Sequence, residues 1–246
     1  MDNKFEIIYK TLKKEIIDGI YNDTMKLPTE AVLVKRFDTS RNTIRRSIQC
    51  LNEDGLVYSV KGRGVVILEN TRVDEMFFKM GNFQGLKALS SYANVKTATK
   101  IRVFEELTVD EKLSKRISFP IGERVFHADR IRLINDRATM HDNSYFKKSI
   151  VKGLNKDIAK ESIYNYINEN LDFNIAASKT VTKVESANKI DSEVLDLGKN
   201  NCVGVVENAV YTDMGKLFEH TTIRYIPNEY AIVSFNQSDK DRVDHL

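Results

Sequence analysis

The sequence predicts an α+β protein in two parts, and two observations support this fold class. Between residues 4 and 56, apolar side chains recur at the three- and four-residue spacing of helices. From about residue 97 onward, short apolar and β-branched runs separated by turn residues predominate, as in strands. A chain of 246 residues has room for two ordinary domains. We predict one domain at 1–70, a linker at 71–84 and a second domain at 85–246.

Three helices and a hairpin are predicted in the first domain. The first helix covers residues 4–20, where the apolar positions form one face. Thr29 is a good N-cap for the second helix. Ser40 or Thr39 can cap the third helix, which Gly55 ends.

The third helix carries polar and basic residues in its first two turns. They are Arg41, Asn42, Thr43, Arg45 and Arg46. Arginine can pair with guanine through two hydrogen bonds, and asparagine can read adenine in the same way. On a single helix such residues could equally be solvated surface charges. The hairpin that follows favours DNA binding, because its tip reads Lys61-Gly62-Arg63-Gly64 and its glycines allow close approach to a phosphate.

The charge distribution agrees with this interpretation. Basic residues outnumber acidic ones by seven to three between positions 35 and 63, whereas the entire chain carries a net charge of only +3. A positive charge concentrated on the predicted reading helix and hairpin indicates nucleic acid as the partner.

Residues 4–69 resemble the winged helix-turn-helix domain of the GntR family of bacterial transcriptional regulators. The matching pieces are LPTE, TSRNTIRRSIQCLNEDGLV and VKGRGVVI. The resemblance implies that Arg41 and Arg45 contact bases and phosphates of double-stranded operator DNA and that Gly62 lies at the wing tip. The family usually has a base-reading arginine after the Glu of LPxE; Ala31 stands there, so we expect that contact to be missing. The full predicted DNA-binding set is Thr29, Ser40, Arg41, Asn42, Thr43, Arg45, Arg46, Lys61, Gly62 and Arg63.

The second domain is predicted to be α+β, with several strands and a long helix. Residues 155–170 have helical periodicity, and Asn135-Asp136 is expected to turn a hairpin. The predicted strands are 100–107, 125–134, 137–146, 175–184, 203–211, 217–225 and 231–235.

Several kinds of site are not expected. The four histidines do not form a ligand-spaced cluster, and no Ser-His-Asp spacing or phosphate-cradling Gly-rich loop occurs. We therefore predict no catalytic residue, no metal site and no cofactor. The chain contains no apolar run of about 18 residues, and its two cysteines lie far apart. Its first residues lack the uninterrupted apolar core of a signal peptide, so no signal peptide is expected. A cytoplasmic protein without membrane contact is expected.

The second domain resembles the effector domain of the HutC branch of the GntR family, the UTRA domain. The resemblance implies the antiparallel sheet of a chorismate lyase-like fold. Within that branch the chain is similar to the trehalose operon repressors, through the segments GNFQGLKALS, FHADRIRL, HDNSYFKK, KESIYNYINENL and LFEHTTIR. The resemblance implies a repressor that is released from DNA by a phosphorylated sugar, trehalose 6-phosphate. A homodimer is also expected, because one winged helix covers too short a site for useful specificity.

Arg130 and Arg132 are the main candidates for binding the effector. They lie two apart on a predicted strand, so both side chains project from one face, and two guanidinium groups suit a phosphate. An exposed charged strand face is the alternative from the pattern alone. The backbone at Gly85, Leu86 and Lys87 could add N–H groups at a helix start, although the subfamily usually has Ser and Phe at the first two positions. The resemblance further implies ligand contacts by Asp142, Ser162, Tyr164, Glu219 and Arg224. Tyr164 could instead be a core aromatic residue, and either carboxylate could simply pair with a lysine.

Three other functions remain open at this stage. The effector could be an amino-sugar phosphate, because such ligands differ from glucose-type phosphates by only a few hydrogen bonds. An enzyme is conceivable because the effector fold resembles a lyase, but the DNA-binding part would then be unexplained. An architectural DNA-binding protein without a ligand is the third possibility.

Overall fold

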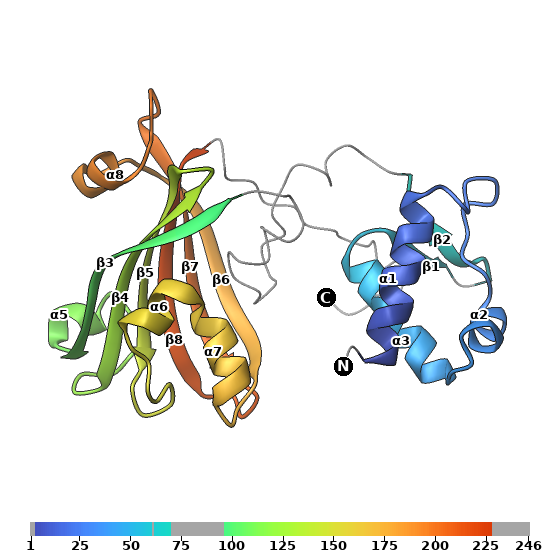
Figure 1. The fold of residues 1–246 in the computed structure, drawn as a ribbon, viewed down its shortest axis with the longest axis horizontal. Coiled ribbons are helices and arrows are strands. Elements are labelled where there is room, and N and C mark those ends of the chain that lie inside the picture. The colour runs from blue at the N-terminus through green and yellow to red at the C-terminus, as the bar shows by residue number, and fades with distance from the viewer. Residues whose placement is uncertain (1–2, 61, 70–95, 228–246) are drawn as a thin grey trace, which may run out of the picture. The chain divides into compact units, whose positions relative to one another are not determined.

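The computed structural model describes residues 3–60, 62–69 and 96–227 (Figure 1). In the sequence, these residues form two separate compact units, one before and one after the undescribed stretch 70–95. The predicted linker at 71–84, the backbone site at Gly85 to Lys87 and the predicted strand at 231–235 lie outside the described residues. Each unit is considered by itself.

The first unit has three helices and a two-stranded antiparallel sheet, as predicted. Its elements are α1 (Lys4–Ile17), α2 (Glu30–Phe37), α3 (Arg41–Glu53), β1 (Val57–Val60) and β2 (Gly64–Ile67). One apolar cluster holds them together, with Leu12, Leu33 and Ile44 fully buried at its centre. Helix α1 ends three residues before the predicted position, because Gly19 adopts the left-handed conformation (φ 75°) that terminates helices.

The second unit is built on one six-stranded antiparallel sheet in the order β3-β4-β5-β8-β7-β6. Its strands are β3 (Thr97–Thr108), β4 (Arg124–Ile134), β5 (Arg137–Lys147), β6 (Ile175–Ser186), β7 (Cys202–Thr212) and β8 (Leu217–Tyr225). The predicted turn between β4 and β5 is confirmed: Asn135 and Asp136 both have positive φ, at 49° and 64°, as a two-residue hairpin turn requires. The predicted α+β class is therefore correct.

The predicted helix at 155–170 is two helices, α6 (Lys156–Glu161) and α7 (Ile163–Asn170). Ser162 interrupts them because it adopts an extended backbone and its side chain accepts a hydrogen bond from the Asn165 N–H, which caps α7. Two further short helices, α5 (Glu111–Ser114) and α8 (Lys189–Val194), were not predicted.

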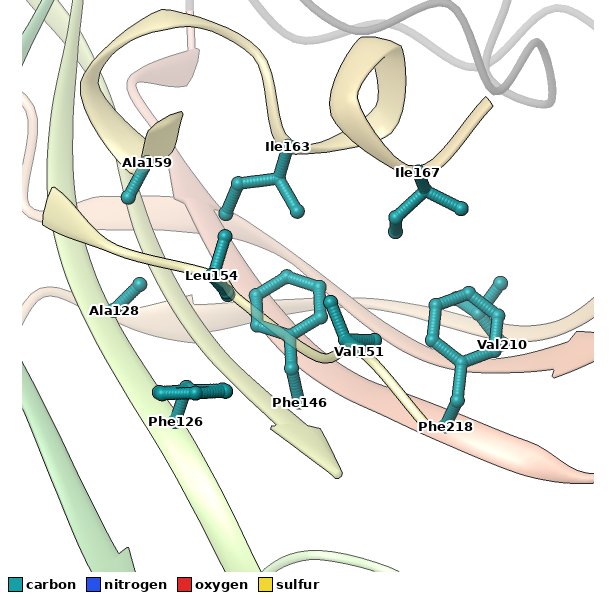
Figure 2. Packing of buried hydrophobic residues seen from close by; sticks show 10 residues of the cluster. All are labelled: Phe126, Ala128, Phe146, Val151, Leu154, Ala159, Ile163, Ile167, Val210 and Phe218. Carbon is teal, nitrogen blue, oxygen red and sulfur yellow. The ribbon is translucent and has the colours of Figure 1, made fainter. Parts of the chain in front are cut away.

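Helices α6 and α7 cover one face of the sheet, which we call the helix-covered face (Figure 1). Ala159, Ile163 and Ile167 pack from these helices onto aromatic residues of the sheet, including Phe146 and Phe218 (Figure 2). This apolar packing fixes the helices above the strands that carry the predicted effector residues.

Candidate functional site

The amino-terminal end of α3 presents the predicted DNA-contacting residues to solvent. Ser40 caps the helix by accepting a hydrogen bond from the Thr43 N–H at 3.2 Å. Arg41 and Asn42 are exposed in its first turn. Thr29 caps α2 in the same way through the Val32 N–H at 3.5 Å. Each cap stabilises the first turn of its helix, and the first turn of a recognition helix is the part that enters a DNA groove.

Arg45 and Arg46 have partners within the first unit. The Arg45 Nε lies 3.0 Å from both carboxylate oxygens of Glu30, and 62% of the Arg45 side chain is exposed. The Arg46 guanidinium lies 3.8 Å from the centroid of the Phe5 ring, a cation–π contact. These contacts orient the two side chains but leave both residues exposed at the surface.

The wing is the hairpin of β1 and β2. Gly62 and Gly64 have φ angles of 78° and 84°, so the tip depends on glycine because other residues rarely adopt this conformation. Arg63 between them is exposed. Lys61, the remaining predicted contact at the tip, lies outside the described residues.

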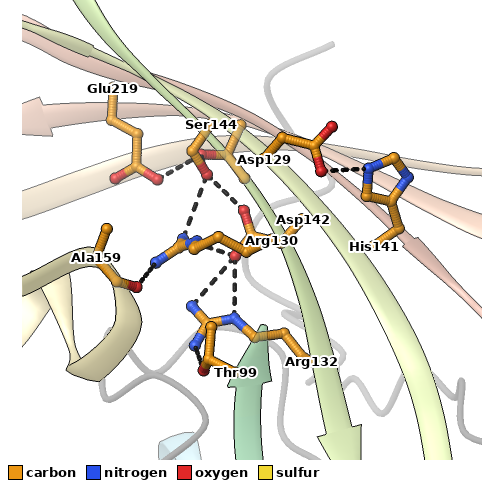
Figure 3. A network of polar contacts seen from close by, with 10 residues as sticks. Thr99, Asp129, Arg130, Arg132, His141, Asp142, Ser144, Ala159 and Glu219 are labelled. Atoms are coloured by element: carbon orange, nitrogen blue, oxygen red, sulfur yellow. Dashed lines mark hydrogen bonds and ion pairs between the residues drawn. The ribbon is translucent and has the colours of Figure 1, made fainter. Parts of the chain in front are cut away.

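Arg130 and Arg132 lie on the helix-covered face of the second unit and both bind Asp142 (Figure 3). One oxygen, Oδ2 of Asp142, lies 2.6 Å from Arg130 Nη2 and 3.2 Å from Arg132 Nη2. Arg130 also donates to the carbonyl of Ala159 in α6, at 3.3 Å, and Arg132 donates to Thr99 at 2.9 Å. The side-chain spacing predicted from the sequence therefore does bring the two guanidinium groups together.

This ion-paired cluster is almost fully withdrawn from water. The side chains of Arg130, Asp142 and Arg132 are 5%, 7% and 13% exposed. Burial alone would raise the pKa of Asp142, but the two arginine charges hold this pKa below its usual range. Burial and the nearby charge of Arg130 lower the pKa of Arg132 to about 10, so the Arg132 guanidinium remains charged at neutral pH and is repelled by its neighbour.

A row of hydroxyl and carboxyl groups extends the cluster from β5 to β8. Ser144 Oγ lies 2.5 Å from Asp142 Oδ1, and Thr221 Oγ1 lies 2.9 Å from Ser144 Oγ. Thr221 Oγ1 is also 2.5 Å from Glu219 Oε1. The Tyr164 hydroxyl of α7 is a further hydrogen-bonding neighbour of Glu219. Burial raises the pKa of Glu219 to about 7.

Two predicted effector residues lie elsewhere or have another structural role. Arg224 projects from the opposite face of the sheet, where it forms ion pairs with Asp191 and Glu185, at 2.8 and 2.6 Å, and so fixes α8. Arg224 therefore lies apart from Arg130 and Arg132, and its contact with an effector stays a prediction. The Ser162 oxygen caps α7, although its O–H remains available as a donor.

Ser144 and Thr221 are not among the residues predicted from the sequence to contact an effector. Strand alternation could have indicated them, because Ser144 is two residues after Asp142 and Thr221 is two after Glu219. Each therefore lies on the same face as its acidic neighbour. Small hydroxyl residues within a strand carry little signal on their own, so only the register between β5 and β8, which pairs Ser144 with Thr221, reveals the row.

Comparison with known proteins assigns both units. Residues 5–67 match the family model for bacterial regulatory proteins of the gntR family, and residues 93–231, more than half of the chain, match the model for the UTRA domain. The chain belongs to the GntR family. It has the UTRA domain of the HutC subfamily, so it is a DNA-binding transcriptional regulator with a small-molecule effector domain and not an enzyme.

Individual relatives match the whole chain or its second unit. The transcriptional regulator TreR of Bacillus subtilis (strain 168) is 28% identical over 238 residues, which cover 97% of this chain and 99% of TreR. The crystal structure of YydK from B. subtilis matches with a TM-score of 0.77 at 22% identity and covers 96% of this chain and all of YydK, which supports the fold. The effector binding domain of the B. subtilis trehalose repressor matches with a TM-score of 0.53 at 26% identity, over 58% of this chain and 99% of that domain.

Two further properties concern the described residues. None of their helices is long and apolar enough to cross a membrane. Within the same residues, no group of three or more His, Cys, Asp or Glu side chains is placed to hold a metal ion.

Proposed function

We propose that this regulator represses a sugar-utilisation operon and leaves its operator when trehalose 6-phosphate binds beside Arg130 and Arg132. The observation that carries the proposal is the convergence of two buried guanidinium groups on one carboxylate oxygen. A phosphate offers the same kind of acceptor with more oxygens and more charge, and arginine binds such groups through paired hydrogen bonds. The similarity to TreR supports trehalose 6-phosphate as the first ligand to test.

The arginine pair has donor capacity left for a ligand. Arg130 Nε is buried and has no hydrogen-bond partner among the described residues. An unfilled buried donor is costly, so a bound anion that accepts from it would be stabilised. Ser144, Thr221, Glu219 and Tyr164 are the nearby groups that could hydrogen-bond sugar hydroxyls. In this proposal the phosphate end lies at the arginines and the sugar end points along β8.

For DNA release we propose a homodimer whose two winged helices contact two operator half-sites. Effector binding changes the relative placement of the two DNA-binding domains, so that they no longer match the half-site spacing. The effector can act in this way only if it binds the released arrangement more tightly than the DNA-bound one.

The test is fluorescence anisotropy of the full-length protein on DNA from upstream of its own gene cluster. Trehalose 6-phosphate is titrated in, with trehalose and N-acetylglucosamine 6-phosphate in parallel, at a fixed salt concentration because phosphate contacts make DNA affinity salt-dependent. Release by trehalose 6-phosphate alone supports the proposal. Release by N-acetylglucosamine 6-phosphate alone supports the amino-sugar alternative. DNA binding that none of the three compounds changes would refute both sugar phosphates as effectors.

A matched pair of variants tests the residues. Arg132→Ala removes one of the two buried guanidinium groups, so the response to the effector should be lost while DNA binding persists. Arg124→Ala removes an arginine from the same strand that is 66% exposed and paired with Glu106, and its response should be normal. A normal response of Arg132→Ala would contradict the assignment of the phosphate site.

A further inference from the structure

The hydrogen-bonded row that ends at Glu219 contains more contacts than its hydroxyl protons can satisfy. Ser144 and Thr221 have one hydroxyl proton each. Three close oxygen–oxygen contacts nevertheless join four residues one after another. Asp142 contacts Ser144 at 2.5 Å, Ser144 contacts Thr221 at 2.9 Å, and Thr221 contacts Glu219 at 2.5 Å. If both carboxyl groups were ionised, two protons would have to serve three contacts, and one buried oxygen pair would repel.

The arginine pair fixes the direction of the row. The charges of Arg130 and Arg132 keep Asp142 ionised, so its Oδ1 can only accept, and the Ser144 proton is directed to it. Thr221 must then give its single proton to Ser144. The proton between Thr221 and Glu219 can therefore come only from the Glu219 carboxyl group.

The surroundings of Glu219 agree with a protonated carboxyl group. Its side chain lies on β8 opposite the apolar Val210 of β7, and the residue is only 3% exposed. Among the described residues, the titratable or charged groups that face it are Tyr164 from α7, Asp142 from β5 and Arg130 from β4. Burial, together with the charge of Asp142, outweighs the opposing effect of Arg130 and the two hydrogen bonds, which leaves the pKa of Glu219 near 7.

We infer that Glu219 is a neutral carboxylic acid in the ligand-free protein and that its proton keeps one net positive charge in the effector site, which selects anionic ligands. The inference rests on the proposed anion site. Two guanidinium groups and the Asp142 carboxylate leave a single positive charge when Glu219 is neutral, and no net charge when Glu219 is ionised. Glu219 is thus a specificity-determining residue that acts by its charge state.

The consequence is an anion affinity that falls as pH rises. Ionisation of Glu219 adds a buried negative charge next to the site and also removes a proton from the row, so Thr221 must reverse its hydrogen bond. For an anion that binds only the protonated form, affinity falls about tenfold for each pH unit above the pKa of the group. Glu219→Gln keeps the shape, the neutral charge and a hydrogen-bond donor, so it should remove this dependence.

Sulfate is a suitable probe because its charge is constant over the pH range of interest. Sulfate affinity of the full-length protein is measured by calorimetry at constant ionic strength, for the unaltered protein and for Glu219→Gln. Between about pH 7.5 and about pH 8.5, we expect the sulfate affinity of the unaltered protein to fall about tenfold relative to that of Glu219→Gln. Equal pH dependence of both proteins overturns the inference.

An infrared difference spectrum tests the proton without any ligand. The spectrum of the unaltered protein minus that of Glu219→Gln should contain the C=O stretch of a protonated carboxyl group near neutral pH, and this band should vanish in alkaline solution. If sulfate binds to neither protein, the proposed anion site and the anion selection by Glu219 both fail, and the band then decides only whether Glu219 is protonated. If Glu219→Gln does not fold, the spectrum of the unaltered protein near neutral pH minus its spectrum in alkaline solution is used instead. A missing band overturns the inference.

Discussion

Replacing Asp142 by Asn should expose what this carboxylate does for the resting protein. Asp142 is the common partner of two buried guanidinium groups. Asparagine preserves the shape of the side chain but removes its charge. Arg130 and Arg132 would then face each other with no counter-ion among the residues that now contact them. Water cannot substitute well, since the two arginine side chains are only 5% and 13% exposed.

The magnitude follows from the loss of one partner of a buried pair. Leaving a buried charge uncompensated costs about 3–5 kcal/mol. The amide oxygen of Asn can still accept one neutral hydrogen bond, so we expect the lower end, about 3 kcal/mol in the free energy of unfolding. For a domain of this size that corresponds to a decrease in Tm of about 10 °C.

An anion in the effector site should reverse this loss. A ligand present at about one hundred times its Kd stabilises the folded state by about 2.7 kcal/mol. Thermal unfolding of Asp142→Asn is therefore measured in sodium sulfate and in sodium chloride of equal ionic strength, and sulfate should restore most of the lost stability. The matched control is Asp136→Asn. The Asp136 side chain is 70% exposed and pairs with Lys96, and such a surface ion pair should contribute less than about 1 kcal/mol.

The outcome that refutes this reasoning is specific. If Asp142→Asn unfolds at the same temperature as the control, the two arginines do not depend on Asp142 as a counter-ion. If Asp142→Asn is destabilised but sulfate and chloride act equally, the site does not accept an external anion in place of the carboxylate. Either result would separate the ion-paired cluster from effector binding.

Two further predictions concern DNA binding and the fold of the second unit. Arg41→Ala should weaken operator binding by about 1–3 kcal/mol in a fluorescence anisotropy titration. The control is Lys115→Ala, which changes an exposed lysine of the second unit and should not alter the affinity. Equal affinities of the two variants would mean that Arg41 does not contact DNA. Gly153→Ala should destabilise the protein by about 2 kcal/mol in urea unfolding, because φ is 74° and the added methyl group would lie 2.6 Å from the Tyr166 hydroxyl. Gly215→Ala has a similar φ of 71° but open space around it, so it should cost about half as much, and equal losses would mean that the contact with Tyr166 is unimportant.

Much of the fold could be predicted from the sequence because its signals are local. The hairpin of β4 and β5 depends on a two-residue turn whose residues tolerate positive φ, and the alternation along each strand indicates which side chains share a face. The break at Ser162 was missed because helical periodicity continues on both sides of it. Helices α5 and α8, with four and six residues, are too short to show a period at all.

The candidate site was predictable only in part. Strand alternation predicts that Arg130 and Arg132 lie side by side. Their ion pairs with Asp142 depend on the register between β4 and β5. A hairpin that continued regularly from the turn would place His141, not Asp142, opposite Arg130, because Ile134 pairs with Arg137 and the partners then advance one by one. The structure differs because β5 contains one extra residue, a β-bulge, beyond Ala138.

This bulge exchanges the faces of the residues that follow it. An insertion of one residue moves every later side chain to the other face of the sheet. Asp142 thereby reaches Arg130, while His141 lies on the opposite face against Asp129, 3.0 Å away. Contacts far away in sequence hold the bulge: the Asp196 carboxylate accepts the Ala138 N–H at 2.6 Å, and the Thr139 carbonyl accepts the Ile226 N–H at 3.0 Å. The sequence around the arginines therefore cannot by itself specify their counter-ion, because segments about 58 to 87 residues later fix the register that supplies it.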